Sequence, residues 1–269
     1  MDKISFAIPD QTGTSPDLEL TGLKNVGIVG VPPRALIARL TAAGVRISDL
    51  DALLVEADFG RTAALLPQVY CGILRTVVLN ALHLAASLDA IIVDIGPGKC
   101  DGARYTADIL RRALKVPVIT CQNLDRQRLG NPICRSRLPL MEKLQRITAG
   151  VLEAQPSPEP LPSCPPGAGF WGVPPRDFSL LELFPANTHV YGWSRCMENK
   201  TPADHQLEIH CRPEIPTVFF AQSFCPKTAL ARYLADRHPQ ALYLDADLHC
   251  GGSAKAKLQA FLELSGVTP

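Results

Sequence analysis

NVGIVGVPPRALIARLTAAG, residues 25–44, joins a short apolar run to a helical pattern that begins at a proline. The run NVGIVGV is typical of a buried strand, and the residues from Pro33 onward repeat apolar side chains at helical spacing. The same alternation continues downstream, with strands predicted at 50–58, 90–96 and 116–121 and helices at 69–87 and 103–114. Apolar strands that alternate with amphipathic helices predict βαβ units, and therefore a mostly parallel sheet covered on both faces.

A proline-rich segment, QPSPEPLPSCPPGAG at 155–169, interrupts this pattern. Its prolines disfavour a helix or a central strand, so we interpret it as a linker between an N-terminal α/β domain at 1–154 and a smaller C-terminal α/β domain at 170–269. The second domain repeats the alternation, with strands predicted at 188–193, 216–222 and 241–247 and helices at 227–238 and 254–264. The predicted fold class is α/β, with two Rossmann-like units joined by the linker.

The composition is that of a soluble globular protein. Of 269 residues, 46% are hydrophobic and 20% are charged, and the net charge is +1, so no strong field favours nucleic acid or an anionic membrane. The longest apolar region, 73–95, contains Arg75, His83 and Asp89, which argues against a membrane span. Residues 1–20 lack the apolar stretch of a signal peptide, and nine cysteines without a C-x-x-C pair indicate a reducing compartment. We expect a cytoplasmic protein that binds neither membranes nor nucleic acid.

The two halves of the chain share an outline. Residues 26–58 run from a strand through Pro33-Arg34 and a helix to a strand, and residues 218–247 do the same through Pro226-Lys227. This is consistent with an internal duplication, although any two βαβ units share this outline. Arg34 and Lys227 place a cation in the first helical turn, where the helix dipole already provides partial positive charge. The pair favours an anionic partner, either a small molecule or an acidic protein; the alternative is two solvated side chains.

Five of the nine cysteines lie at or just beyond the end of a predicted strand: Cys100, Cys121, Cys196, Cys225 and Cys250. In an open parallel sheet this edge is where ligands bind, and soft thiolates suit zinc, copper(I) or an iron–sulfur cluster. The first hypothesis is a metal- or iron–sulfur-binding protein acting in redox chemistry or cofactor assembly, with ligands Cys100, Cys121, Cys225 and Cys250. The arrangement resembles nitrogenase-type components and 2-hydroxyacyl-CoA dehydratases, and this likeness of architecture implies a metallocluster between the units. Each cysteine could instead be a buried core residue.

Two further hypotheses involve enzymes without metal thiolates. Asp94 closes a strand and is followed by the glycine-rich turn of Gly96 and Gly98, which brings backbone amides close to a ligand. With Asp245 and Asp247, these residues favour a nucleotide- or phosphate-binding enzyme that uses Mg²⁺. Alternatively, Cys225 precedes a helix whose N-terminus would lower the thiol pKa, which predicts a transferase or hydrolase with a cysteine nucleophile. No complete catalytic motif is present, and a non-enzymatic partner-binding protein is also consistent with the sequence.

Aromatic and polar side chains crowd into residues 167–211, which contain both tryptophans, Trp171 and Trp193. Loops that carry such residues are often functional rather than connective. Two interpretations are open: a lid over a crevice, with a tryptophan against a planar ligand, or plain packing of a small domain.

Overall fold

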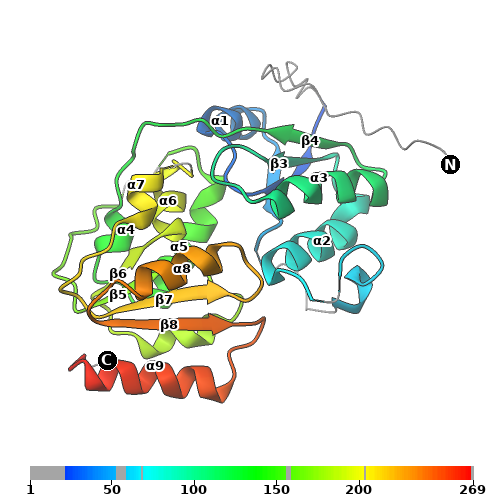
Figure 1. Cartoon of the computed structure of the whole chain (residues 1–269). Coiled ribbons are helices and arrows are strands. Elements are labelled where there is room, and N and C mark those ends of the chain that lie inside the picture. The colour runs from blue at the N-terminus through cyan, green and yellow to red at the C-terminus, as the bar shows by residue number, and fades with distance from the viewer. Residues whose placement is uncertain (1–21, 53–58, 68, 156–158, 203, 268–269) are drawn as a thin grey trace.

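The structure, a computed structural model, describes residues 22–52, 59–67, 69–155, 159–202 and 204–267. Figure 1 shows two α/β units, each built around a four-stranded sheet. Every pair of neighbouring strands in the two sheets is parallel, which confirms the predicted α/β class with two Rossmann-like units. Parallel strands need crossover connections, and the helices between the strands provide them.

The first sheet has the strand order β2-β1-β3-β4. Its strands are β1 (Asn25–Val29), β2 (Arg46–Asp49), β3 (Ala90–Asp94) and β4 (Val118–Cys121), and its helices are α1 (Arg34–Ala42), α2 (Gly72–Leu84) and α3 (Asp101–Ala113). Two 3₁₀ turns, η1 (Phe59–Thr62) and η2 (Ala85–Ser87), flank α2. The strand predicted at 50–58 begins where β2 has already ended, and its residues 53–58 lie outside the described part of the chain.

The central strands of this sheet are buried on both faces, because successive side chains point to opposite sides of a strand. In β3, Ile91 and Val93 pack with α2 and α3, whereas Ile92 packs in a larger core that includes α1. That larger core continues into the second unit, where it includes Phe170 of its sheet. The two units therefore share one hydrophobic core.

The second sheet repeats the order as β6-β5-β7-β8. Its strands are β5 (Ala168–Trp171), β6 (Thr188–Tyr191), β7 (Thr217–Gln222) and β8 (Ala241–Ala246), and its helices are α6 (Trp193–Asn199), α7 (His205–Ile209), α8 (Lys227–Ala235), α9 (Gly252–Leu264) and the 3₁₀ helix η4 (Phe178–Leu183). Helix α8 packs on one face of this sheet, and α9 and η4 pack on the other. The sheet is therefore covered on both sides, as a parallel sheet requires.

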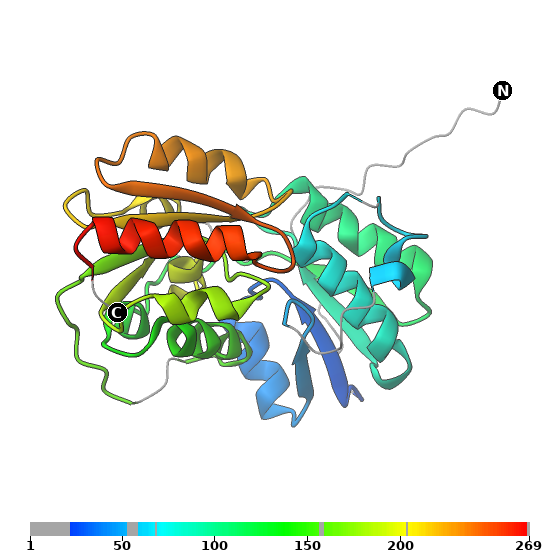
Figure 2. The same ribbon diagram turned by 90° about the horizontal axis from the view of Figure 1, so that it is seen from below.

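Helices α4 (Pro132–Arg135) and α5 (Leu140–Ala149) precede the proline-rich segment in the chain but pack on the second unit. They contact β6, α6 and η4, and a 3₁₀ turn, η3 (Gly150–Leu152), ends this segment. Figure 2 shows these green helices on the side of the second sheet. The chain therefore crosses to the second unit after β4, before it reaches the proline-rich segment.

The two units repeat each other in a different register from the one that the sequence outline suggested. Strand order equates β1 with β5 and β3 with β7, whereas the comparison of 26–58 with 218–247 set β1 against β7. In the structural register the pentapeptide Gly-Val-Pro-Pro-Arg follows the first strand of each unit, at 30–34 and at 172–176. The shared strand order and the repeated pentapeptide support an internal duplication.

Candidate functional site

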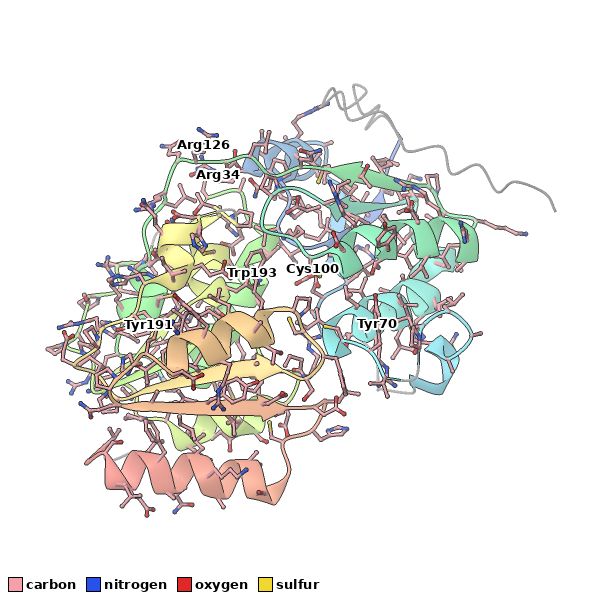
Figure 3. All side chains as sticks on the ribbon, in the orientation of Figure 1. Arg34, Tyr70, Cys100, Arg126, Tyr191 and Trp193 are labelled. Carbon is pink, nitrogen blue, oxygen red and sulfur yellow. The ribbon has the colours of Figure 1, made fainter. Side chains whose placement is uncertain are left out.

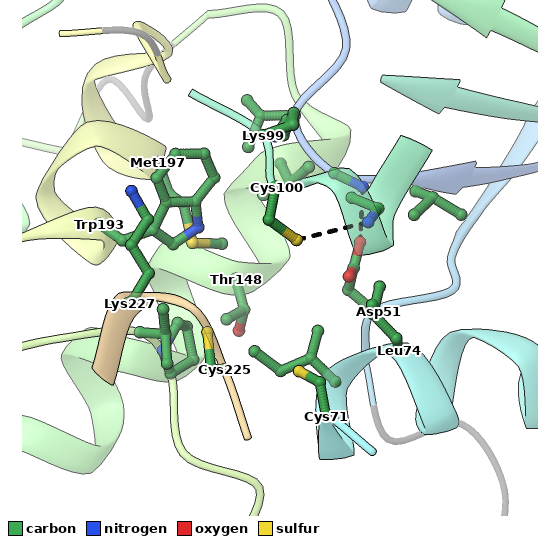
Figure 4. A pocket seen from close by; sticks show the side chains of 18 of the residues that line it. Asp51, Cys71, Leu74, Lys99, Cys100, Thr148, Trp193, Met197, Cys225 and Lys227 are labelled. Carbon is green, nitrogen blue, oxygen red and sulfur yellow. Dashed lines mark hydrogen bonds between the residues drawn. The ribbon is translucent and has the colours of Figure 1, made fainter. Parts of the chain in front are cut away.

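A pocket of about 810 Å³ lies between the two units. Its walls are formed by the segments that follow β1, β2 and β3 in the first unit and β5, β6 and β7 in the second. Apolar side chains contribute much of the lining, among them Val31, Leu74, Val173 and Met197 (Figure 4). Its size and its place at the carboxyl ends of parallel strands are those of a ligand-binding site.

Three cysteines line this pocket, and each lies at the start of a helix. Cys71 and Cys100 immediately precede α2 and α3, and Cys225 lies two residues before α8. In Figure 4 their three sulfur atoms point toward the same space. The first turn of a helix carries amide hydrogens without helical partners, and these stabilise a thiolate. In this way the sulfur of Cys100 accepts the amide hydrogen of Ala103 at 3.4 Å.

Cys71 and Cys225 form a pair that joins the two units. The side-chain interaction with Cys225 is the main cause that lowers the pKa of Cys71 to about 7; the amides of Leu74 and Ile73 at the start of α2 act in the same direction, and burial opposes them. The same interaction with Cys71, together with burial, raises the pKa of Cys225. The negative charge is therefore favoured on Cys71.

Cys121 and Cys250, two of the four predicted metal ligands, lie outside the pocket lining and are buried in the shared core. Burial is the main cause that raises the pKa of Cys121 to about 12 and that of Cys250 to about 11. Of the predicted ligands, the pocket therefore brings together Cys100 and Cys225. Across the described ranges, no group of three or more His, Cys, Asp or Glu side chains could hold a metal ion.

Two lysines occupy equivalent places in the two units, Lys99 five positions after the end of β3 and Lys227 five positions after the end of β7. Both lie over the indole ring of Trp193, with Nζ 4.5 Å and 5.1 Å from the ring centroid. Lys99 also lies 3.1 Å from the carboxylate of Asp94, and Lys227 pairs with Glu208. The pocket thus contains two ammonium groups held beside an aromatic ring, an arrangement that each cation–π contact stabilises.

Two carboxyl groups and an arginine form another part of the lining. Asp49 ends β2, and its Oδ1 accepts the amide hydrogen of Asp51 at 2.9 Å. Oδ2 of Asp51 accepts the amide hydrogen of Gly30 at 2.6 Å (Figure 4). Arg176 belongs to the second unit, and its Nη1 donates to the backbone oxygen of Asp51 in the first unit at 2.6 Å. Burial, followed by repulsion from Asp51, raises the pKa of Asp49 to about 8.

The predicted glycine-rich turn after β3 contributes to the pocket. Asp94 and Gly98 of this turn line the pocket, and so does Lys227 at the start of α8; all three are predicted binding residues. Gly96 is not part of the pocket lining; its amide donates a hydrogen bond to Oδ1 of Asp94 at 3.0 Å. A Cβ at Gly96 would meet the amide nitrogen of Asn123 at 2.8 Å, so the close approach requires glycine.

Arg34, Asp245 and Asp247 are predicted site residues that the structure places elsewhere. Arg34 lies near Arg126, apart from Cys100 and Trp193 (Figure 3). Its Nε lies 3.6 Å from the carboxylate of Asp125 in its own unit. Asp245 and Asp247 are exposed at the end of β8, so they are not brought to Asp94 as a magnesium site would require.

Of the two tryptophans, Trp193 lines the pocket and Trp171 does not. Trp171 is fully buried in β5, and its Nε1 donates to the backbone oxygen of Glu208 at 2.8 Å. Residues 167–211 form β5, β6, α6 and α7, so this segment is part of the second unit's framework as well as of the pocket wall.

Sequence reasoning missed Cys71, Lys99, Asp49 and Arg176. Cys71 fell inside the helix predicted at 69–87, whereas α2 begins immediately after it. The repeated Gly-Val-Pro-Pro-Arg was a signal that could have identified Arg176 as the counterpart of Arg34. No sequence signal identified Asp49, because its role depends on a residue of the other unit.

No helix in the described part of the chain has the length and apolar character needed to cross a membrane. No protein family model matches the chain, and no curated protein matches it.

Proposed function

We propose that this protein holds an iron–sulfur cluster on Cys71, Cys100 and Cys225 and uses it in redox chemistry on an organic ligand bound in the same pocket. The observation that carries the proposal is the convergence of three cysteine sulfurs, from three helix starts in two units, on one pocket. Two of these cysteines are ligands predicted from the sequence, and Cys71 takes the place of the buried Cys121 and Cys250.

A cluster suits this arrangement better than a single zinc ion. Ligands of one tetrahedral zinc ion, with Zn–S bonds of about 2.3 Å, lie only about 4 Å from one another. The described residues contain no group packed closely enough to hold such an ion. In a four-iron cluster each thiolate binds a different iron atom, so its cysteines stand further apart. With three protein ligands, one iron of a four-iron cluster would have no protein ligand.

The rest of the lining favours an organic anion as the ligand. Apolar side chains such as Val31, Val173 and Met197 suit the body of an organic molecule. Lys99 and Lys227 provide positive charge beside Trp193, and this replaces the predicted anion site of Arg34 and Lys227. The same lining is less suited to an acidic protein partner, because the lysines lie inside a pocket.

The test is the iron content of cysteine variants after anaerobic purification or reconstitution. Cys71→Ser, Cys100→Ser and Cys225→Ser should each lose most of the bound iron and the visible absorbance of the cluster. Cys121→Ser and Cys250→Ser are matched controls, because both are buried outside the pocket, and they should retain it. Wild-type protein free of iron after reconstitution, or equal loss in all five variants, contradicts the proposal.

A second candidate is a metal-free enzyme with Cys71 as nucleophile. The observation that favours it is the place of Cys71 at the start of α2, in contact with Cys225, where its surroundings lower the thiol pKa to about 7. In the metal-free protein, iodoacetamide should then modify Cys71 first and Cys225 far more slowly, since the pKa of Cys225 is raised. Alkylation that is fast in purified, untreated protein supports this candidate, whereas protection that disappears on iron removal supports the cluster.

A further inference from the structure

The carboxyl pair and the arginine beside the thiols have no part in holding a cluster. Asp49 and Asp51 come from the end of β2, and Arg176 follows β5 in the other unit. All three line the pocket. The amide hydrogen of Arg176 is donated to the side chain of Gln222 at 3.1 Å, which fixes the backbone from which the guanidinium extends.

The Arg176 guanidinium does not use all of its hydrogen-bond donors within the described part of the protein. Nη1 of Arg176 donates to Asp51, but its buried Nε has no hydrogen-bond partner among the described residues. Leaving a buried donor unpaired costs free energy, and Arg176, which lines the pocket, has further N–H groups on its guanidinium that can donate to an acceptor on a ligand. Asp49 is also buried and, when protonated, supplies a second donor in the same place.

We propose that Asp49 and Arg176 form a subsite that binds an oxygen acceptor of the pocket's ligand, a carbonyl or carboxylate oxygen, and that Asp49 passes a proton to it. This deepens the proposed function, and it rests on that function only in assuming that the ligand occupies the same pocket. Arg176 is the positioning residue, and Asp49 is the proton donor.

The proton step balances without any further reactant. The O–H bond of Asp49 breaks as an O–H bond forms on the ligand oxygen, and the electron pair stays on Asp49 as a carboxylate. Arg176 then stabilises that carboxylate by its charge. The proton transfer itself oxidises and reduces nothing.

The charged groups around Asp49 set its protonation. Burial and the Asp51 carboxylate keep it protonated at neutral pH, while the Asp51 amide and Arg176 act in the opposite direction. Arg176 also faces the thiol of Cys71. The donor of Asp49 is therefore present at neutral pH and is lost as the pH rises through about 8.

The first experiment is infrared spectroscopy of the protein between pH 5.5 and 9.5, without any ligand. A C=O band of a protonated carboxylic acid should be present at pH 7 in the wild type, and the component that belongs to Asp49 should be absent in Asp49→Asn. Asp51→Asn, the matched control, removes a neighbouring carboxylate and should keep a band. A wild type without this band at pH 7 overturns the inference and leaves the cluster proposal intact, since the band does not depend on iron.

The second experiment measures binding of three probes of similar size: acetophenone, benzoate and ethylbenzene. At pH 6.5 an oxygen-bearing probe should bind about tenfold more tightly than ethylbenzene, the effect of about one hydrogen bond. Tighter binding of acetophenone identifies a carbonyl site, and tighter binding of benzoate a carboxylate site. The preference should fall between pH 6.5 and 9 in the wild type and stay constant in Asp49→Asn, whose amide donates without titrating.

Asp49→Ser, with a hydroxyl that does not titrate, repeats the test if Asp49→Asn does not fold. No preference for either oxygen probe, or a wild-type pH profile in these variants, overturns the subsite. Loss of iron in the cysteine variants would leave these binding results unchanged, so the two proposals fail separately.

Discussion

At the residue level, Lys143 links helix α5, which precedes the proline-rich segment, to the second unit. It is fully buried in α5, and its ammonium donates to the backbone oxygens of Ala186 at 3.1 Å and Thr188 at 2.5 Å. Burial lowers its pKa from 10.5 to about 8. A buried ammonium is retained here because it pairs two carbonyl groups that would otherwise lack donors.

The pKa of Lys143 gives a prediction about the pH dependence of stability. Between pH 8 and 10.5 the unfolded chain keeps the Lys143 proton and the folded chain releases it. The free energy of unfolding therefore rises with pH through this contribution, by up to about 1.4 kcal/mol per pH unit. Lys143→Met should lack this rise, whereas exposed Lys257→Met should keep it. Urea unfolding at several pH values measures the difference, and parallel curves for the wild type and Lys143→Met would contradict it.

At the level of elements, the turn that follows the first strand of each unit determines where the next residues lie in the pocket wall. Gly30 after β1 and Gly172 after β5 both have positive φ, +83° and +157°. The backbone oxygen of Gly172 accepts the amide hydrogen of Ser194 at 3.1 Å and its hydroxyl at 2.9 Å. This fixes the start of the segment that carries Val173 and Arg176 into the pocket, beside α6 with Trp193.

Gly172→Ala should destabilise the protein strongly. The new Cβ would lie 2.6 Å from the backbone oxygen of Phe220, and the φ angle is one that residues with a side chain rarely adopt. We expect a loss of more than about 2 kcal/mol in the free energy of unfolding. Gly252→Ala is the control, because nothing lies within 4 Å of its Cβ and alanine favours the first turn of α9. A Gly172→Ala variant as stable as Gly252→Ala would contradict the expectation.

At the level of the whole molecule, one core unites both sheets, and the chain crosses between them at α4 and α5. Leu140, Leu144 and Ile147 of α5 are buried against the second unit, although they precede the proline-rich segment. The thiols that line the pocket come from both units. The pocket therefore forms only where the shared core holds the two units together.

A fragment of residues 131–267 should therefore fold more stably than one of residues 159–267. The shorter fragment exposes the apolar surface that α5 covers, at a cost of about 1.5–3 kcal/mol for each of Leu140, Leu144 and Ile147. Circular dichroism and thermal unfolding of the two fragments measure this difference. Equal stability would show that the unit begins at the proline-rich segment, as the boundary predicted at 155–169 implies.

Local patterns in the sequence were sufficient for the α/β class, the two units and most of the strands, whereas β2 was placed too late in the chain and β5 was not predicted. Apolar alternation reflects which backbone segments are buried, and this depends on neighbours a few residues away. For the same reason the sequence identified Cys100 and Cys225 as ligand-side residues, since each follows a predicted strand. It also located Asp94 and Gly98 at an edge where parallel sheets bind ligands.

The tertiary structure decided which strand ends meet and which side chains face the gap between them. Cys121 ends a strand just as the sequence predicted, but its side chain lies in the core. Arg34 and Arg176 each end the same pentapeptide; the first pairs with Asp125 in its own unit, and the second donates to Asp51 in the other unit. These differences arise from the relative placement of two sheets through a shared core, a long-range packing effect that no local pattern along the chain encodes.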